Sequence, residues 1–416
     1  MDPGADHGAA QGAKPNPKPG GIVILAPRNT RFSPASATSI DLYIHEIAVL
    51  SRYRDAITVF AESLEQPFTD VSAASWTRAE PFRARLARLA ETEPRLIVVH
   101  QHLPTADRLT RALPDVPVAL VRHNFVKPPL LFSAWAKRRQ MGRLAGIAFV
   151  SECCRAAFEA AWPEVATERF VTPNGVDASL WRPAAEKARR VLFVGRLAPE
   201  KGVLEAARAL TRLLPERPDW QALFILDTRG AEPGYAARVR AALAEAGAAT
   251  VTDVPHARVQ AEMARAAIVL APTQNAEPFG RVAIEAMASG AALVASRAGG
   301  FVEIADGAAL LLPRPDAPAI AAATARLMDH PAEAAALGAA GRDRVAARYG
   351  LEAAAAAFDA MAARLMGEAL PHETTPLPTL EARLTPPGKE RASASDTAAI
   401  EGDRHRLRLL EGGRRR

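Results

Sequence analysis

The chain has 416 residues, of which 49% are hydrophobic and 24% are charged, and its formal net charge is +6. That length is too great for one ordinary hydrophobic core and suits two domains with additional tails. The modest positive charge slightly favours anionic ligands and gives no reason to expect nucleic acid as a partner. Because no stretch of about 18 apolar residues runs without a charge, no membrane-spanning helix is expected.

The two ends and the cysteines bear on the location of the protein. Residues 1–20 are rich in Pro, Gly and Ala, lack the pattern of a secretory signal, and are predicted to form a disordered lead. Residues 370–416 are Pro-rich and basic at their end, which predicts a disordered tail. The adjacent Cys153 and Cys154 are expected to be buried or half-buried thiols. A cytoplasmic, reducing location fits these features.

Short apolar runs alternate with helical patterns in the first part of the chain. Buried strands are predicted at 21–26, 57–61, 96–100, 116–121 and 146–150. Amphipathic helices are predicted between them, for example at 40–50 and 82–90. Near-continuous Val, Ile and Leu strands separated by helices indicate a parallel sheet that is covered on both faces.

The same alternation restarts after residues 174–186, which are rich in turn formers and are predicted to be an interdomain linker. The second series of strands is predicted at 191–194, 222–226, 249–254, 268–271, 292–295 and 309–312. Residues 316–368 have a helical pattern, and the last helix, 351–368, is expected to complete the first lobe. We therefore expect an α/β protein of two doubly wound lobes, 21–173 and 187–350, that face a central crevice.

The segment that begins at Glu277 has the pattern of a ligand-binding turn. Glu277 follows the predicted strand at 268–271, and residues 281–288 have a helical pattern. Backbone N–H groups of residues 279–281 would be free at the start of this helix, where the helix dipole also favours an anion. The sequence therefore predicts a diphosphate site at this turn.

Two glutamates flank the same turn. Glu285 lies just over one turn into the helix and can reach back to accept hydrogen bonds from both hydroxyls of a ribose. Glu277 would face a sugar beyond the phosphates. On spacing alone, the alternative is a capping role for Glu277 and a solvated helix face for Glu285.

A second segment, 191–202, has the pattern of a strand, a glycine turn and the start of a helix. Arg196 and Lys201 lie where the strand passes to the helix, so both side chains can converge on the crevice. A guanidinium and an ammonium there can neutralise the charge that a departing nucleoside diphosphate develops. The alternative is a surface ion pair with Glu200.

These segments resemble the signature of the GT4-type retaining glycosyltransferases, which have the GT-B fold. The spacing of Glu277 and Glu285 matches the E-x7-E motif of that family, and residues 195–202 match the opening of its second domain. Residues 298–304 resemble its Gly-Gly turn and following acidic residue, and residues 173–183 resemble its interdomain linker. Four such motifs in the right order are more specific than any one of them.

The resemblance implies roles for individual residues. Arg196 and Lys201 would hold the donor diphosphate, and Glu285 would hold the ribose. Glu277 would hold the transferred sugar, and His123, just past a predicted strand, resembles a family histidine near the reacting centre. The implied catalytic residues are Glu277, His123, Arg196 and Lys201. The implied donor-binding residues are Glu285, Pro278, Phe279, Gly280, Arg281, Gly195 and, on the nucleotide side, Glu303.

The resemblance covers residues 20–368, but two loops depart from it. The first loop, 27–39, lacks the Gly-Gly pair that many relatives carry, and its Arg28 and Arg31 are candidates to meet an anionic acceptor instead. Residues 227–230 lack the Gly-x-Gly that is often found there, so the sequence does not indicate how a nucleotide base is held.

The family implies transfer of a hexose-type sugar from a nucleoside-diphosphate sugar to a glycan or glycolipid acceptor, with retention of anomeric configuration. It implies no cofactor and no metal, and the sequence contains no Asp-x-Asp. The missing export signal and the acceptor-side arginines favour envelope polysaccharide or lipopolysaccharide synthesis. A sugar-nucleotide epimerase of the same fold and a non-catalytic two-lobed sugar-binding protein are the alternatives. A dehydrogenase is disfavoured, because no G-x-G-x-x-G follows the first strand.

Residues 127–144 mix basic and bulky apolar side chains. A helix of this kind on the acceptor lobe is suited to rest on an anionic membrane leaflet, which would place the protein at the inner face of the membrane. The alternative is a helix that packs Leu131, Trp135 and Met141 into the lobe and leaves its basic residues in water.

Overall fold

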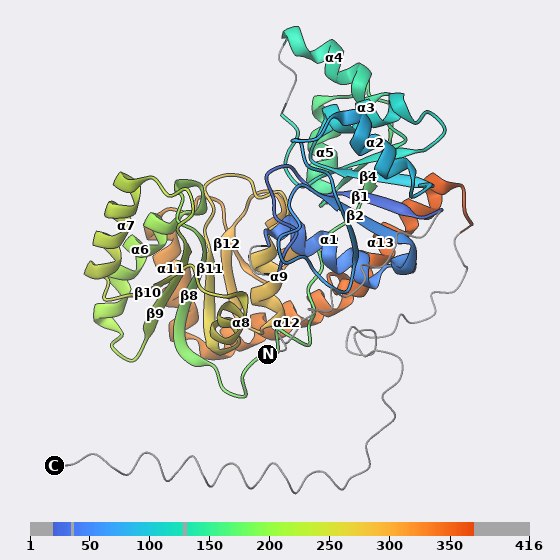
Figure 1. Cartoon of the computed structure of the whole chain (residues 1–416). Coiled ribbons are helices and arrows are strands. Elements are labelled where there is room, and N and C mark those ends of the chain that lie inside the picture. Colours follow the sequence, from blue (N-terminus) through green and yellow to red (C-terminus); the bar gives the residue numbers. More distant parts are fainter. Residues whose placement is uncertain (1–19, 35–36, 128–130, 370–416) are drawn as a thin grey trace, which may run out of the picture. The chain divides into compact units, whose positions relative to one another are not determined.

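The computed structural model describes residues 20–34, 37–127 and 131–369. The predicted tail at 370–416 and all but the last residue of the predicted lead at 1–20 lie outside these ranges. Within them the chain forms two parallel sheets flanked by helices (Figure 1). The expected α/β class with two parallel sheets is therefore confirmed.

The first sheet has seven strands in the order β3-β2-β1-β4-β5-β6-β7, and every neighbouring pair is parallel. Its strands are β1 (Ile22–Leu25), β2 (Ile57–Ala61), β3 (Ser72–Ser75), β4 (Leu96–His100), β5 (Val118–Arg122), β6 (Gly146–Phe149) and β7 (Glu168–Val171). The helices in this part of the chain are α1 (Ser39–Leu50), η1 (Arg54–Ala56), α2 (Phe82–Ala90), α3 (Leu103–Ala112), α4 (Leu131–Met141) and α5 (Glu152–Ala161). Because the strands are parallel, their carboxyl ends lie along one edge of the sheet.

The second sheet has six parallel strands in the order β10-β9-β8-β11-β12-β13. Its strands are β8 (Ala188–Arg196), β9 (Gln221–Asp227), β10 (Ala249–Thr252), β11 (Ala266–Ala271), β12 (Ala292–Ser296) and β13 (Leu310–Leu312). The helices that accompany it are η2 (Pro199–Lys201), α6 (Val203–Leu213), η3 (Leu214–Glu216), α7 (Pro233–Glu245), α8 (His256–Arg265), α9 (Arg281–Ala288), α10 (Gly300–Ala305), α11 (Ala317–Asp329) and α12 (Pro331–Arg348). A last helix, α13 (Leu351–Met366), follows.

Helices cover both faces of the second sheet, as its apolar strands predict. Successive side chains of a strand point to opposite faces. On β8, Val191 and Phe193 belong to the hydrophobic cluster under α6, α7 and α11, whereas Leu192 belongs to the cluster under α8, α9 and α12. Burial on both faces explains why these strands have continuous apolar sequences.

The two strands that sequence patterns did not predict, β3 and β7, both lie at edges of the first sheet. β3 has the sequence Ser-Ala-Ala-Ser, and β7 begins with Glu168 and Arg169; neither strand contains a fully buried residue. Edge strands of this kind carry no continuous apolar signal. The first sheet ends at Val171 and the second begins at Ala188, while the domain boundaries at 173 and 187 stay a prediction.

Helix α4 bears on the two interpretations of residues 127–144, which were a membrane-facing helix and a helix packed into the lobe. Met141 is 3% exposed and packs into the first core, but Trp135 is 62% exposed. The packing alternative therefore holds for Met141 and is wrong for Trp135, and the side chain of Leu131 lies outside the described residues. In the part of the chain that the structure describes, no helix is both long enough and apolar enough to cross a membrane.

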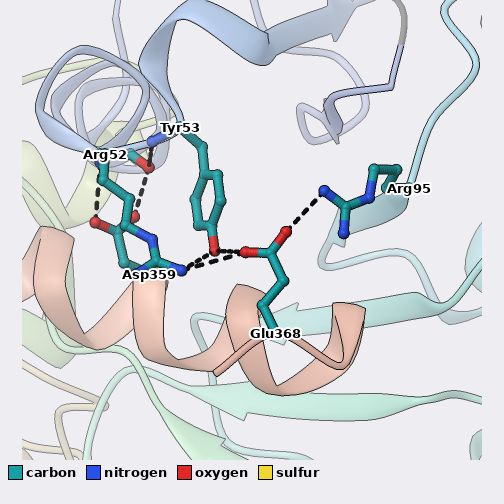
Figure 2. A network of polar contacts seen from close by, with 6 residues as sticks. Arg52, Tyr53, Arg95, Asp359 and Glu368 are labelled. Atoms are coloured by element: carbon teal, nitrogen blue, oxygen red, sulfur yellow. Dashed lines mark hydrogen bonds and ion pairs between the residues drawn. The ribbon is translucent and has the colours of Figure 1, made fainter. Parts of the chain in front are cut away.

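The chain ends its described part on the first sheet, where α13 packs against α1 and β4. Glu368, just after α13, accepts a hydrogen bond from the Tyr53 hydroxyl (2.6 Å) and forms an ion pair with Arg95 (2.7 Å). Figure 2 shows these contacts. It also shows a second carboxylate of this region, that of Asp359 on α13, which contacts residues just after α1. The two carboxylates therefore fasten α13 to residues that follow α1 and precede β4.

Asp359 is the more buried of the two fastening points. It accepts hydrogen bonds from the hydroxyl of Ser51, which is fully buried, and from the backbone N–H of Arg52 (2.9 Å). Asp359→Ala should lower the free energy of unfolding by about 1–3 kcal/mol for each donor left unpaired. Urea denaturation measures this, with Asp343→Ala, an exposed aspartate on α12, as the control. Equal losses in the two variants would contradict the assignment.

Candidate functional site

A cavity of about 700 Å³ opens at the carboxyl ends of β8 and β11 and is also lined by residues 37–40 and 123–124 of the first part of the chain. Its volume lies in the range of about 300–1,000 Å³ that is usual for small-molecule sites. It brings together nine of the residues singled out in the sequence, namely His123, Gly195, Arg196, Lys201, Glu277, Pro278, Phe279, Gly280 and Arg281.

An ion pair joins the two sequence motifs inside this cavity. The ammonium of Lys201, at the end of η2, donates to Oε2 of Glu277 over 2.7 Å. Their side chains are 26% and 19% exposed, so the pair is half-buried and little screened by water. Lys201 therefore does not pair with Glu200, and the surface-pair alternative is wrong for it.

Glycines hold the Glu277 loop in place through close backbone contacts. Gly299 bridges to Glu277 in parallel fashion, and the N–H of Gly300 donates to the Glu277 carbonyl over 2.7 Å. A Cβ on Gly299 would lie 2.2 Å from that carbonyl oxygen, and one on Gly300 would lie 2.5 Å from the carbonyl oxygen of Phe279. Any other residue at these two positions would push the loop away. Close packing against the Glu277 loop therefore explains why two glycines stand at this turn.

Helix α9 begins in the cavity without a side-chain cap. Its N-cap is Gly280, with φ of +102°, a conformation that only glycine adopts without strain. Gly280, Arg281 and Val282 all line the cavity, so the first turn of the helix and its free N–H groups border it. The capping alternative for Glu277 is therefore wrong, because its carboxylate is engaged by Lys201 instead.

Glu285 is buried below the start of α9. Its side chain is 10% exposed, lies 3.5 Å from Nε of Arg281 and 3.9 Å from Nε2 of His256, and is not part of the cavity wall. Burial raises the pKa of Glu285, but His256 and Arg281 together outweigh it, so the pKa lies below the ordinary value. The solvated-face alternative is wrong, and the carboxylate is ionised at neutral pH.

Arg281 connects Glu285 to the first part of the chain. Its guanidinium forms two hydrogen bonds of 3.0 Å with the carboxylate of Glu46 on α1. Both side chains are less than one-fifth exposed, a setting in which a bidentate pair is stronger than one at the surface. A second contact links the same regions, because the Ser151 hydroxyl donates to the Pro278 carbonyl over 2.6 Å.

Arg196 lies at the rim of the cavity. Its guanidinium donates to Glu200 over 2.8 Å and its side chain is 55% exposed. The surface ion pair with Glu200, which was the alternative interpretation of Arg196, is therefore present. The same side chain also lines the cavity. Exposed pairs of this kind contribute little to stability, about 0–1 kcal/mol, and exchange partners easily.

His123 directly follows β5, and its ring meets a second histidine. Nε2 of His123 lies 2.8 Å from Nδ1 of His100, and the ring of Tyr43 packs edge-on against it at 5.2 Å. Burial and the neighbouring Arg122 lower the pKa of His123 to about 3, so the imidazole is neutral at neutral pH. Since one proton lies between the two rings, only one of them donates in this contact.

Three other candidates lie outside the cavity. Glu303 accepts a hydrogen bond from the backbone N–H of Cys153 over 3.3 Å, and burial raises its pKa. Arg31 forms an ion pair with Glu65 in which both side chains are more than 60% exposed. Arg28 lines a different pocket. The expected thiols are half-buried for Cys153 and buried for Cys154, as predicted.

Sequence reasoning missed several polar residues of the cavity wall. Asp227, Arg229, Asn174 and Thr273 all line it. A hydrogen bond from Arg229 lowers the pKa of Asp227, and the two side chains form a bidentate pair with distances of 2.8 and 2.9 Å. Asp227 is the last residue of β9 and pairs with Arg196 on β8. Its position at the carboxyl end of a predicted strand could therefore have identified it as a cavity residue.

Comparison with known proteins shows which families the chain is similar to. The family "Glycosyl transferases group 1" matches residues 181–344. Alpha-maltose-1-phosphate synthase of Mycolicibacterium smegmatis is 30% identical over 285 residues, which are 59% of this chain and 73% of that protein. Lipopolysaccharide 1,2-N-acetylglucosaminetransferase of Salmonella typhimurium is 26% identical over 251 residues, 55% of this chain and only 63% of that protein. Anabaena HepE, solved with UDP and glucose, is 18% identical with a TM-score of 0.66, over 84% of this chain and 99% of the other.

The buried His123 predicts a pH dependence of stability. Its pKa of about 3 lies below the ordinary 6.5. Between pH 3 and pH 6.5, His123 therefore binds a proton in the unfolded chain but not in the folded chain. The free energy of unfolding should fall as the pH drops through this window. His123→Asn should make the fall shallower by up to about 1.4 kcal/mol per pH unit.

Urea denaturation at a series of pH values measures this slope. His330→Asn, which removes an exposed histidine, serves as the control and should keep the wild-type slope. A wild-type slope in His123→Asn would show that the ring is not held neutral.

Proposed function

The chain belongs to the group 1 (GT4-type) glycosyltransferases of GT-B fold, and we propose that it transfers a hexose-type sugar from a nucleoside-diphosphate sugar to a glycan or glycolipid acceptor with retention of anomeric configuration. The observation that carries the proposal is the convergence of Lys201, Glu277 and the uncapped start of α9 on one cavity. A cation and free N–H donors are suited to a diphosphate, and a carboxylate beside them is suited to accept a hydroxyl of the attached sugar.

Lys201 and the start of α9 would bind the diphosphate. The ammonium of Lys201 has three N–H donors, and Glu277 occupies one of them, which leaves two for phosphate oxygens. Arg196 at the rim would add a second cation by exchanging its exposed contact with Glu200 for the phosphate. The free carboxylate oxygen of Glu277 would then accept a hydroxyl of the sugar.

Glu285 would bind the ribose from below. It is ionised, and a carboxylate accepts from two vicinal hydroxyls at once. Its contact with His256 is long, at 3.9 Å, and the His256 side chain is 47% exposed. A ribose hydroxyl is therefore able to take the place of His256 without disturbing Arg281.

The proposed reaction passes through an oxocarbenium-like state at the anomeric carbon. The departing diphosphate develops negative charge that Lys201, Arg196 and the α9 dipole stabilise. The leaving phosphate oxygen takes the proton of the acceptor hydroxyl, so no side-chain base is required. His123 is neutral and would act as a hydrogen-bonding partner of the sugar rather than as a charge.

The acceptor is proposed to belong to envelope polysaccharide or lipopolysaccharide synthesis. The Salmonella relative supports this through its named activity. On α4, Trp135 is exposed among the exposed Lys137, Arg138 and Arg139, a combination suited to the surface of an anionic membrane. Liposome co-sedimentation that is independent of anionic lipid content would count against this contact.

The donor site predicts nucleotide-specific stabilisation. One nucleoside diphosphate among UDP, GDP and ADP should raise the melting temperature, because a ligand that binds only the folded state stabilises it. Lys201→Ala and Glu285→Ala should each weaken its affinity about 10-fold or more, a loss of about 1.4 kcal/mol. The matched exposed changes Lys137→Ala and Glu245→Ala should leave the shift unchanged. If no nucleotide raises the melting temperature of the folded wild type, the proposed function has no support, although the fold is unaffected by this result.

The stereochemical course gives an independent test. With the donor found in this way and an acceptor extract, NMR of the product should give the same anomeric configuration as the donor. Release of the nucleoside diphosphate should depend on the acceptor, which separates transfer from epimerisation. An inverted product would contradict the proposed mechanism.

A further inference from the structure

A second histidine, His100, lies behind His123 and has no role in the function proposed above. It is the last residue of β4, it is 2% exposed, and its ring packs, like that of His123, against the ring of Tyr43. Burying the two polar nitrogens of an imidazole is costly unless they are hydrogen-bonded. The contacts of its nitrogens therefore have to offset the cost of burying His100.

The two histidine rings are joined by a hydrogen bond that lies in their planes. Nδ1 of His100 is 2.8 Å from Nε2 of His123, the ring planes are inclined by 23°, and the ring centroids are 5.1 Å apart. A contact of 2.8 Å is too short for two rings that lie face to face, so the two nitrogens point at one another. Because a ring nitrogen carries its proton or its lone pair in the ring plane, this hydrogen bond is well aligned.

Both rings are neutral, so the positions of their protons are coupled. Burial, followed by the neighbouring His123, lowers the pKa of His100 well below its ordinary value, and burial holds that of His123 at about 3. Each ring therefore has one protonated nitrogen at neutral pH. Two arrangements fit the hydrogen bond: either Nδ1 carries the proton in both rings, or Nε2 carries it in both. The state of Nε2 in His100 thus decides the state of Nδ1 in His123.

His100 lines a pocket of about 20 Å³, which has room for about one water. Its Nε2 has no hydrogen-bond partner among the residues that the structure describes. The guanidinium side chains of Arg28, Arg78 and Arg85 line the same pocket, and none of them can accept a hydrogen bond. A protonated Nε2 would therefore meet other donors, whereas an unprotonated Nε2 is able to accept from them, directly or through a water.

The acceptors of this pocket are already engaged. Both carboxylate oxygens of Glu62 are used, one by the backbone N–H of Asn29 (2.8 Å) and the other by Nε of Arg78 (2.5 Å). The Thr105 hydroxyl accepts a long hydrogen bond from Arg28, at 3.4 Å. The side chains of the pocket therefore offer more N–H donors than free acceptors.

A third histidine, His102, adds to the donors. Its Nδ1 accepts a hydrogen bond from the backbone N–H of Thr105 over 3.0 Å, so this nitrogen carries no proton. Burial, followed by Arg28 and Arg78, lowers the pKa of His102 to about 4, and the neutral ring therefore has its proton on Nε2. With His102 as a further donor at the pocket, an unprotonated Nε2 is the favoured state of His100.

We propose that His100 is a positioning residue that fixes the tautomer of His123, so that His123 presents its Nδ1–H to the cavity as a hydrogen-bond donor. Nδ1 is the nitrogen left for a ligand, because Nε2 of His123 contacts His100 and His123 lines the cavity. The inference rests on the proposed function and defines the role of His123 in it. A neutral N–H there selects an oxygen, such as that of a sugar hydroxyl, and disfavours a group that only donates, such as a protonated amine.

The tautomer of His123 can be measured directly by NMR. In the full chain labelled with isotope-enriched histidine, protonated and unprotonated ring nitrogens have different chemical shifts. At neutral pH, His123 should show a protonated Nδ1 and an unprotonated Nε2, and its signals are assigned by their loss in His123→Asn. A wild type in which Nε2 of His123 carries the proton would overturn the proposal.

Two substitutions of His100 separate its hydrogen bond from its packing. The amide N–H of an asparagine takes nearly the place of Nδ1, so His100→Asn should keep Nδ1 of His123 protonated. His100→Phe keeps a ring against Tyr43 but removes the donor, so His123 should then populate both tautomers. His330→Asn, which removes an exposed histidine, should leave the His123 signals unchanged. The same single tautomer of His123 in the Asn and Phe variants would contradict the positioning role.

Donor binding gives a second readout, which a purely structural role of His100 would not produce. The hydrogen bond of His123 concerns the sugar and not the diphosphate. In His100→Phe, calorimetry should find the affinity for the nucleoside diphosphate found above unchanged, and that for its sugar derivative reduced about 3- to 10-fold. His100→Asn should restore most of this loss.

The outcomes separate the two proposals. Equal losses of both affinities in His100→Phe would show damage to the whole site, which would overturn the positioning role and leave the transferase function intact. Failure of every nucleoside diphosphate to bind to the wild type would instead reject the function itself, and with it the role of His123 toward a donor sugar.

Discussion

The cavity that we propose as the donor site depends on the close approach of one glycine turn to one loop. Gly299 and Gly300 lie against the backbone of residues 277–279 so tightly that no Cβ fits at either position. Gly202 approaches the Pro272 carbonyl in the same way, with a hypothetical Cβ only 2.0 Å from its oxygen. These contacts bring the loop after β11 against η2 and α10, and they fix the distance between Lys201 and Glu277.

The same constraint sets the electrostatics of the cavity. With the loop in place, Gly280 precedes α9 as its N-cap in a left-handed conformation, and the helix presents an uncapped first turn. Arg281, the first residue of that helix, is then held between Glu46 and Glu285. One guanidinium thus joins the carboxylate proposed for the ribose to helix α1 of the first sheet. Donor binding and the contact between the two parts of the chain are expected to influence each other through it.

The central strands could be predicted from sequence because burial on both faces requires continuous Val, Ile and Leu. β3 and β7 could not, because edge strands such as Ser72–Ser75 are half-buried and carry no such pattern. A short motif was enough to single out residues 277–281, which line one cavity, while their roles stay a prediction. The site was not predicted where partners come from distant segments. Only the fold reveals that His256 and Arg281 keep Glu285 ionised, or that Arg28 and Arg85 share a pocket.

The most direct test of the central claim is a crystal structure with the nucleoside diphosphate that stabilises the protein. We predict phosphate oxygens within hydrogen-bonding distance of Lys201 Nζ and of the first N–H groups of α9, with the ribose hydroxyls on Glu285. A nucleotide bound elsewhere, or one whose phosphates leave the Lys201–Glu277 ion pair and the start of α9 untouched, would contradict it.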